Sequence, residues 1–394
     1  MRIRRHITAL GLALSLAAVV PAAAGAQAAA VAPVSLETTV DRIAADLIAR
    51  KESAGFAIGI EQNGIVRLAR GYGYANLEDG TRVTEHTVFR IGSVTKQFTA
   101  AAILLLAEDG KLSLDDRLAK YLPTFPRGGE VTLRQLLTHT SGIRNYTGYP
   151  DFLKGQSPRA LTGDEMIAYI AGATPAYDFD PGTGWSYSNS GYLLLGIVVE
   201  KGSGQPLAQV LRTRIFEPLG LRDTRLDDLA EIVPGRASGY DKAAASPTGF
   251  ANAGFIAMEV AAGAGAIRST VGDLLKWNDA LLGGKLLKPA SLRMMLEPAR
   301  LIDGRLASAA RAGPAAAAAT SEPPSNYGFG ITTGEQKGRR TIGHGGSING
   351  FNASLTSYPD QKVTIVVLTN TLPAAGAVTA ALVDPVFAAL RPTR

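Results

Sequence analysis

The feature that most constrains the fold of this chain is a change of hydrophobic period along its length. Near the N-terminus, residues 56–61 and 65–72 are strand-like, and the Asn63-Gly64 pair between them is typical of a hairpin turn. Strand-like segments return near the C-terminus, at 329–333, 340–343, 352–358 and 363–369. The pattern therefore predicts one sheet that is built from the two ends of the chain.

The segment between these ends is predicted to form helices and loops, because Pro and Gly separate its apolar stretches. The helices predicted along the chain cover 36–51, 98–107, 133–137, 163–170, 192–201, 207–216, 270–282 and 374–390, the last interrupted at Pro385. An alanine-rich stretch at 306–324 is predicted to be a surface loop. We expect an α/β fold of the α+β type, with a sheet lobe from about 29–92 and 264–394 and an inserted helical lobe from about 93–263.

The first residues have the layout of a secretory signal peptide. Arg2, Arg4 and Arg5 are followed by an apolar stretch over 7–20 and by the cleavage pattern Ala26-Gln27-Ala28. The alternative is a retained membrane anchor, but the apolar stretch is shorter than the ~20 residues that a span requires. We expect cleavage after Ala28, a mature chain over 29–394 and a periplasmic or secreted protein without stable membrane insertion.

Charge and cysteine content exclude several classes of function. The formal net charge is +6, and removal of residues 1–28 takes away three arginines and no acidic residue, which lowers it to +3. No basic block remains that would indicate nucleic acid as a partner. The chain has no cysteine, so disulfides, thiol catalysis and thiolate metal sites are excluded.

Ser93-Val94-Thr95-Lys96 forms an S-x-x-K pattern directly before the apolar segment 98–107. Residues three apart lie on one face of a helix, so the lysine amine can reach the serine hydroxyl. A serine hydroxyl needs a base within hydrogen-bond reach to act as a nucleophile, and a lysine can be that base when burial lowers its pKa. Taken alone, the pattern is also compatible with an N-cap serine and a solvated lysine.

Two further patterns could complete a site around this serine. In Tyr187-Ser188-Asn189, the phenol can relay a proton, and the amide can hold a substrate carbonyl and the lysine amine together. In His344-Gly345-Gly346-Ser347, the glycines permit close approach of substrate to a strand edge, and the histidine could donate to a polar or anionic substrate group. The Ser347 N–H could pair with the Ser93 N–H as an oxyanion hole. Each pattern also has a purely structural explanation, as loop, cap or turn residues.

Other catalytic arrangements are disfavoured. No G-x-S-x-G pattern surrounds Ser93, as a Ser-His-Asp hydrolase of the elbow type would require. Of the four histidines, His6 lies in the expected signal peptide, and His139 lies at a predicted helix end and is expected to be structural. No H-E-x-x-H pattern occurs, so no zinc site is expected, and no other metal or cofactor is indicated.

The three patterns occur in the order S-x-x-K, Y-x-N, H-x-G, and in this the chain resembles the serine β-lactamase and D,D-peptidase superfamily. The second pattern has tyrosine where class A β-lactamases have serine. In this the chain resembles the class C β-lactamase-like branch, which includes esterases, D-aminopeptidases and amide hydrolases. The similar segments are FRIGSVTKQFTAAAILLLAEDGKLSLDD (89–116), LLTHTSGI (136–143), GWSYSNSGYLLLGIVVE (184–200), AGAIRSTVGDLLKW (264–277) and GHGGSINGFNASLTSYPD (343–360).

The resemblance implies a fold and a set of roles. Ser93 would be the acylated nucleophile, Lys96 its base and Tyr187 a partner in proton transfer. Asn189 would bind substrate, and the N–H groups of Ser93 and Ser347 would form the oxyanion hole. The implied fold is an antiparallel sheet flanked by helices, with the site between sheet and helical lobe. The implied reaction is hydrolysis of a small ester, a D-amino-acid peptide or a cell-wall peptide.

One departure from the resembled family bears on substrate. Class C β-lactamases have lysine at the position of His344, and a largely neutral histidine suits a β-lactam carboxylate less well than a permanent cation. Glu165 also lacks the Leu-Asn ending of the class A deacylation motif. The alternatives are a true β-lactamase, a non-catalytic penicillin-binding or cell-wall sensor protein, and a periplasmic solute-binding protein with two similar lobes on parallel sheets.

Overall fold

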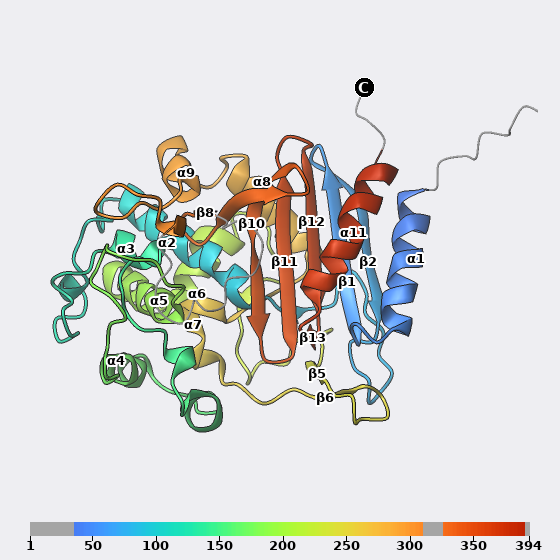
Figure 1. The fold of residues 1–394 in the computed structure, drawn as a ribbon, viewed down its shortest axis with the longest axis horizontal. Helices are drawn as coiled ribbons and strands as arrows, with labels where there is room; N and C mark the ends of the chain where they lie inside the picture. Colours follow the sequence, from blue (N-terminus) through green and yellow to red (C-terminus); the bar gives the residue numbers. More distant parts are fainter. Residues whose placement is uncertain (1–34, 310–325, 391–394) are drawn as a thin grey trace, which may run out of the picture. The chain divides into compact units, whose positions relative to one another are not determined.

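The two ends of the chain form one antiparallel sheet, as the hydrophobic period predicts. The computed structural model describes residues 35–309 and 326–390. Its largest sheet has the strand order β2-β1-β12-β11-β10-β9-β8, in which β1 pairs with β12 and Phe56 lies opposite Thr369 (Figure 1). The strands are β1 (Gly55–Gln62), β2 (Ile65–Gly73), β8 (Asn326–Tyr327), β9 (Thr332–Gln336), β10 (Arg339–Ile348), β11 (Phe351–Tyr358) and β12 (Val363–Thr369).

Helices cover both faces of this sheet. The helices α1 (Leu36–Ala49) and α11 (Ala375–Ala389) pack on one face, and α8 (Val271–Leu282) packs on the other (Figure 1). In β12, Val363, Ile365 and Val367 join the cluster under α1 and α11, whereas the alternate residues Val366 and Leu368 join the core on the α8 side. Because β12 is covered on both faces, all of its residues are buried and its sequence is almost continuously apolar.

The middle of the chain is largely helical. The predicted helices found there are α2 (Thr95–Glu108), α3 (Leu133–Leu137), α4 (Gly163–Ala171), α5 (Asn189–Ser203) and α6 (Leu207–Leu211); two further helices that were not predicted are α7 (Ala262–Gly265) and α9 (Pro289–Leu296). A π-helical turn over 212–216 continues α6. The helix α2 is buried from Thr95 to Leu106 and contacts α5 and α7, so it lies at the centre of the helical core. Within the described residues, none of the helices is long and apolar enough to cross a membrane.

Short strands in the middle of the chain were not predicted. Two three-stranded sheets contain β3 (Phe89–Arg90), β4 (Arg225–Leu226), β5 (Tyr240–Lys242), β6 (Phe250–Asn252), β7 (Ile267–Ser269) and β13 (Thr371–Leu372). Strands of two or three residues are too short to show a period of two. The region expected to contain only helices and loops therefore also contributes β4, β5 and β6.

Several predicted elements differ from the structure in their bounds or continuity. The strand expected over 329–333 begins at Thr332, because Gly330 has φ +66° and packs against the carbonyl of Lys96. The strand expected to end at Gly343 continues to Ile348. The helix α11 is not interrupted at Pro385, since burial of its apolar face against the sheet outweighs the lost hydrogen bond. The predicted signal peptide (1–28) and most of the alanine-rich stretch (306–324) lie outside the described residues.

A buried carboxylate joins the short strands beside the start of α2. Asp227 accepts hydrogen bonds from Arg90 of β3 at 3.0 Å, from Arg268 of β7 at 3.0 Å and from Arg236 at 2.9 Å. Its side chain is 1% exposed. Since a buried guanidinium without its counter-charge is costly, this cluster should contribute strongly to the stability of the region around residue 90.

We expect Asp227→Asn to lower the free energy of unfolding by about 3–5 kcal/mol, because the change leaves the buried Arg268 and the partly buried Arg90 and Arg236 without their full counter-charge. The matched control is Asp384→Asn, since Asp384 pairs with Lys337 and Arg339 but is 52% exposed. That exposed pair should contribute no more than about 1 kcal/mol. Urea unfolding of the two variants measures the difference, and equal losses would contradict this account of Asp227.

Candidate active site

Ser93 and Lys96 lie on one face of the chain where it enters α2. Ser93 is in a short 3₁₀ turn over Gly92–Val94, and α2 begins two residues later at Thr95. The Lys96 side chain points back along this turn, and its Nζ lies 3.0 Å from Ser93 Oγ. Ser93 is partly exposed, whereas Lys96 is completely buried. The predicted proximity of amine and hydroxyl is present.

Three oxygens surround the Lys96 amine: an ammonium ion could donate to all three, whereas a neutral amine could donate to two and accept from the third. Nζ donates to Asn189 Oδ1 at 2.8 Å and to the carbonyl oxygen of Ala264 at 2.8 Å. Both oxygens are acceptors only. A neutral amine has two hydrogens, which these two oxygens can take. Its lone pair is then left for the remaining neighbour, the Ser93 hydroxyl, which is the one group of the three that can donate.

Burial supports this neutral state of the amine. Desolvation lowers the pKa of Lys96 well below its ordinary value, because the site has removed the water that would stabilise an ammonium ion. No carboxylate among the described residues forms an ion pair with Lys96. A neutral lysine in contact with a serine hydroxyl is the arrangement that general-base activation of the hydroxyl requires.

Tyr187 faces the same amine. Its ring centroid lies 4.8 Å from Lys96 Nζ. Its hydroxyl is buried and makes no hydrogen bond of normal geometry with any residue that the structure describes. Burial raises the pKa of Tyr187, and the nearby Ser93 hydroxyl opposes this rise. The phenol is therefore neutral, and its proton is not committed to another protein group.

Asn189 is the first residue of α5 and connects the lysine to the helical core. Its Oδ1 faces Lys96, its Nδ2 donates to Thr147 Oγ1 at 3.2 Å, and its backbone N–H donates to Asn145 Oδ1 at 3.0 Å. These contacts fix the amide so that its oxygen faces the amine. The expected contact with lysine is present, and Nδ2 has a protein partner in this structure.

The strand β10 closes against the turn that carries Ser93. A Cβ on Gly346 would overlap the carbonyl oxygen of Ile91 and would lie 3.2 Å from the Ser93 nitrogen. A Cβ on Gly92 would lie 2.6 Å from the Ser347 nitrogen. Only glycine permits this approach, which brings the amide nitrogens of Ser93 and Ser347 to the same junction. The geometry is compatible with the predicted oxyanion hole.

His344 is also on β10, but both of its ring nitrogens have protein partners. Nδ1 contacts the carbonyl oxygen of Gly345, which can only accept, so Nδ1 carries the proton. Nε2 then accepts from the Tyr327 hydroxyl at 2.9 Å. Burial lowers the pKa of His344 to about 4. The predicted donation from His344 to substrate is therefore not available in this arrangement, because neither nitrogen is free.

Two cavities meet at Ser93. The first, of about 470 Å³, is lined by Ser93, Tyr187, His344, Gly345, Gly346, Ser347, Asn352, Ala353, Ser354 and Gly376. The second, of about 230 Å³, is lined by Ser93, Tyr146, Thr147, Phe152, Leu153, Asn189, Ile256, Ala261, Ala264, Gly265, Ser347, Ile348, Asn349 and Leu372. Ser93 and Ser347 line both. No Asp, Glu, Lys or Arg is among the described residues that line either cavity. A molecule that reaches Ser93 therefore meets neutral walls on both sides.

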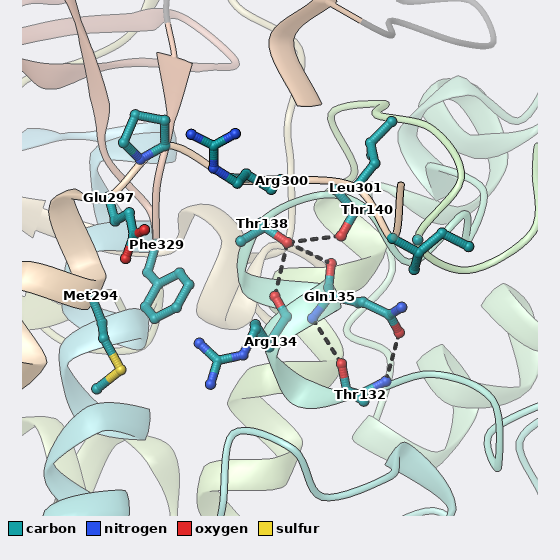
Figure 2. A pocket seen from close by; sticks show the side chains of 14 residues that line it. Thr132, Arg134, Gln135, Thr138, Thr140, Met294, Glu297, Arg300, Leu301 and Phe329 are labelled. Carbon is teal, nitrogen blue, oxygen red and sulfur yellow. Dashed lines mark hydrogen bonds between the residues drawn. The ribbon is translucent and has the colours of Figure 1, made fainter. Parts of the chain in front are cut away.

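A third cavity, of about 340 Å³, contains none of the predicted site residues. It lies beside α3 and includes Arg134, Glu297, Arg300 and Phe329 (Figure 2). Its polar groups on α3 are largely paired with one another: Thr132 and Gln135 form a reciprocal N-terminal cap, and Thr138 Oγ1 donates to the Arg134 carbonyl (Figure 2). It holds no serine with an adjacent base, so its residues offer no comparable chemistry.

Two residues near the site were not predicted as part of it. Tyr327 holds His344, and His139 packs beside Tyr187 with a ring-centroid distance of 4.4 Å. The segment Leu136–Ile143 was noted as similar to the resembled family, and that similarity was the one available signal for His139. Nothing in the local pattern around Tyr327 indicates its contact with His344.

The chain is similar to known proteins over most of its length. Residues 40–386 match the model of a family described as Beta-lactamase. Penicillin-binding protein 4* of Bacillus subtilis is 29% identical over 327 residues, which cover 78% of this chain and 68% of that protein. A D-aminopeptidase of Gluconobacter oxydans is 27% identical over 342 residues, which cover 86% of this chain and 60% of that enzyme. The chain thus spans only three-fifths to two-thirds of these relatives.

Solved structures have the same fold. A D-amino acid amidase from Ochrobactrum anthropi, in complex with D-phenylalanine, superposes with a TM-score of 0.75 at 26% identity, covering 91% of this chain and 99% of that one. The octameric penicillin-binding protein homologue from Pyrococcus abyssi gives a TM-score of 0.74 at 26% identity, covering 88% and 76%. The predicted antiparallel sheet flanked by helices is confirmed by the observed topology and by these neighbours.

The neutral state of His344 predicts a pH-dependent stability. An unfolded histidine binds a proton with pKa 6.5, whereas folded His344 does so only near pH 4. As pH falls from about 6.5 to 4, the unfolded chain therefore takes up a proton that the folded chain does not, and the free energy of unfolding falls by up to roughly 3 kcal/mol. Because His344→Gln lacks this ionisation, the stability advantage of the wild type over the variant should shrink over that range. A difference between the two proteins that is constant from pH 7 to pH 4 would contradict the pKa.

Proposed function

The chain belongs to the Beta-lactamase family of serine hydrolases, and we propose that it hydrolyses a neutral ester or amide through an acyl-enzyme on Ser93. The observation that carries the proposal is the contact between the Ser93 hydroxyl and the amine of Lys96, which is completely buried and whose pKa burial lowers. No other residue pair in the two cavities combines a nucleophile with a base at this distance.

Acylation follows from the hydrogen positions. Lys96 Nζ accepts the Ser93 proton as Oγ attacks the substrate carbonyl carbon, and the carbonyl oxygen becomes an oxyanion between the N–H groups of Ser93 and Ser347. When the bond to the leaving group breaks, Tyr187 donates its proton to the departing atom and receives one from the Lys96 ammonium. The serine then carries the acyl group, and Lys96 is neutral again.

Deacylation uses the same groups in reverse. As the water oxygen attacks the acyl carbon, Tyr187 accepts a proton from the water and passes its own proton to the Lys96 amine. The oxyanion of this second tetrahedral intermediate again accepts hydrogen bonds from the N–H groups of Ser93 and Ser347. Ser93 Oγ leaves with a proton from the Lys96 ammonium. Lys96 starts and ends each half of the cycle as a neutral amine, which its burial favours.

The walls of the two cavities support a neutral substrate. The smaller cavity is lined by Phe152, Ile256, Ile348 and Leu372, and it suits an apolar group. His344 is neutral and has both nitrogens occupied, so it supplies no cation for a carboxylate beside the scissile bond. Both features favour neutral esters and amides over β-lactams. The names of the relatives add D-amino-acid amides and peptides as candidate substrates.

The alternative is a non-catalytic penicillin-binding or cell-wall sensor protein. Its supporting observation is the name of the relatives described as penicillin-binding proteins. A sensor would be acylated once and would not turn over. The preserved contact of Lys96 with Ser93 and the uncommitted Tyr187 proton favour turnover, and the first experiment below separates the two functions.

We expect a fluorophosphonate probe to label the wild type on Ser93 and not to label Ser93→Ala. Lys96→Met keeps the nucleophile but removes its base, and it should lower kcat/KM for p-nitrophenyl butyrate by about 10²–10⁴-fold. The control is Lys201→Met, because Lys201 is an exposed lysine on α5. Its activity should match the wild type. Labelling of Ser93→Ala, or a single acylation of the wild type without turnover, would defeat the proposal of an acyl-serine hydrolase.

A substrate panel tests the neutral, apolar pocket. We expect kcat/KM to rise up to about tenfold from p-nitrophenyl acetate to butyrate, because two more CH₂ groups are buried at ~0.8 kcal/mol each. Nitrocefin should be a poor substrate. Ile256→Ala removes part of the smaller cavity wall and should reduce the butyrate preference without changing acetate hydrolysis. A strong preference for nitrocefin would assign a different substrate class, whereas a preference for D-Ala-p-nitroanilide over both esters would single out the D-amino-acid amides among the candidates and contradict a neutral substrate.

A further inference from the structure

His139 holds both neighbours of Tyr187. The backbone N–H of Ser186 donates to the His139 carbonyl oxygen at 3.1 Å. The backbone N–H of Ser188 donates to His139 Nδ1 at 3.2 Å. One residue therefore fixes the main chain on each side of the tyrosine, through its own main chain on one side and through its side chain on the other.

The His139 ring is enclosed by aromatic side chains. His139 is 1% exposed, and its ring centroid lies 4.4 Å from that of Tyr187, 4.5 Å from Tyr327 and 5.2 Å from Tyr192. Its backbone has φ +60°, a left-handed conformation that few non-glycine residues adopt. Such a conformation persists only where the surrounding contacts determine it. The side chain and the backbone of His139 are thus both constrained by the segment that carries Tyr187.

The hydrogen bond to Ser188 also defines the tautomer of His139. Because Nδ1 accepts from an N–H, the ring proton must lie on Nε2, which has no hydrogen-bond partner among the described residues. If Nδ1 carried the proton instead, two N–H donors would face each other and this hydrogen bond would be lost. Burial lowers the pKa of His139 well below its ordinary value. His139 and His344 thus carry their protons on opposite nitrogens.

Tyr187 depends on this support because its hydroxyl makes no hydrogen bond of normal geometry with a described residue, and the neighbouring polar group is the reacting Ser93 hydroxyl. Its ring packing and its main chain therefore place the phenol beside Lys96. His139 makes the shortest ring contact with Tyr187, at 4.4 Å compared with 6.2 Å for Tyr327 and for His344, and it also bonds to the main chain on both sides of the tyrosine. A displacement of about 1 Å at such a group can cost roughly a hundredfold in rate.

We propose that His139 is a positioning residue, which places the Tyr187 phenol for proton transfer through its two hydrogen bonds to the amides of Ser186 and Ser188. The proposal rests on the proposed function, because it assumes that Tyr187 transfers the proton to the leaving group. His139 itself touches neither Ser93 nor Lys96 by hydrogen bond. It acts through Tyr187 alone.

The test compares two substitutions of His139. Asparagine keeps an acceptor, since Oδ1 takes the place of Nδ1, and it tolerates the left-handed backbone. Leucine keeps the volume but has no acceptor. We expect His139→Leu to lower kcat for p-nitrophenyl butyrate by roughly ten- to a hundredfold with KM within about threefold. For His139→Asn, both kcat and KM should stay within about threefold of the wild-type values. Equal losses in the two variants would overturn the proposal.

A double-mutant cycle separates positioning from general loss of stability. In a Tyr187→Phe background, which has no phenol to place, His139→Leu should lower kcat by less than about twofold. The control Tyr192→Phe removes a buried hydrogen bond to the Leu137 carbonyl in the same cluster, and kcat should stay within about threefold of the wild type. If His139→Leu lowers kcat equally with and without the Tyr187 phenol, His139 has only a structural role. If the leucine variant does not fold, His139→Gly replaces it, because glycine adopts the left-handed backbone without cost.

A measurement that needs no turnover keeps this proposal distinct from the proposed function. The chain has four histidines, so selective ¹⁵N labelling of histidine resolves their ring nitrogens. At neutral pH we expect His139 to be protonated on Nε2 and His344 on Nδ1. A proton on His139 Nδ1 would exclude the bond from Ser188 and overturn the positioning role, even in an active enzyme. If the esters are not hydrolysed but this pattern is seen, the proposed function fails while the anchoring contact stands.

Discussion

The buried contact between Lys96 Nζ and Ser93 Oγ is the interaction on which the rest of the structure depends. A lysine without water is tolerated only as a neutral amine or with a compensating charge, and the described part of the chain provides no such charge. Two carbonyl oxygens, from Asn189 and Ala264, take the hydrogens of the amine and leave its lone pair directed at the serine. Burial, which would normally count against a lysine in a core, is therefore what would suit this lysine to the proposed role of a base.

The surrounding architecture maintains that burial. The helix α2 is enclosed along almost its whole length, so the first turn that carries Lys96 cannot reach solvent. Gly330 lets the chain before β9 cross the Lys96 carbonyl, and Gly346 lets β10 close on the turn of Ser93. The same close approach that excludes water from Lys96 brings the Ser347 amide to Ser93. Base and oxyanion site are thus two results of one packing arrangement between the sheet and the helical core.

Two buried histidines surround the reacting groups and carry their protons on opposite ring nitrogens. His344 donates to a carbonyl within its own strand and accepts from Tyr327, whereas His139 accepts from the loop of Tyr187. Neither is free to bind a substrate anion in this arrangement. The departure of His344 from the lysine of class C β-lactamases, visible in the sequence, therefore has a structural counterpart: the position is neutral and internally bonded. This is the physical reason to favour a neutral substrate.

The order of the main elements could be read from the sequence alone, because hydrophobic period and turn residues are local properties: the helices from 36–51 to 270–282 and the strands at both ends were found at or near their predicted places. It also indicated Ser93 and Lys96, since their spacing of three is a helical contact. Only the tertiary structure decided where the two- and three-residue strands lie, why α11 continues through Pro385, and which groups hold Tyr187 and His344. His139 and Tyr187 are 48 positions apart, and no local pattern encodes a hydrogen bond between segments so distant in the chain. That contact exists because packing of α3 against α5 brings both segments to one buried place. A buried polar atom without a hydrogen bond is costly there, so the Ser188 N–H and His139 Nδ1 pair with each other.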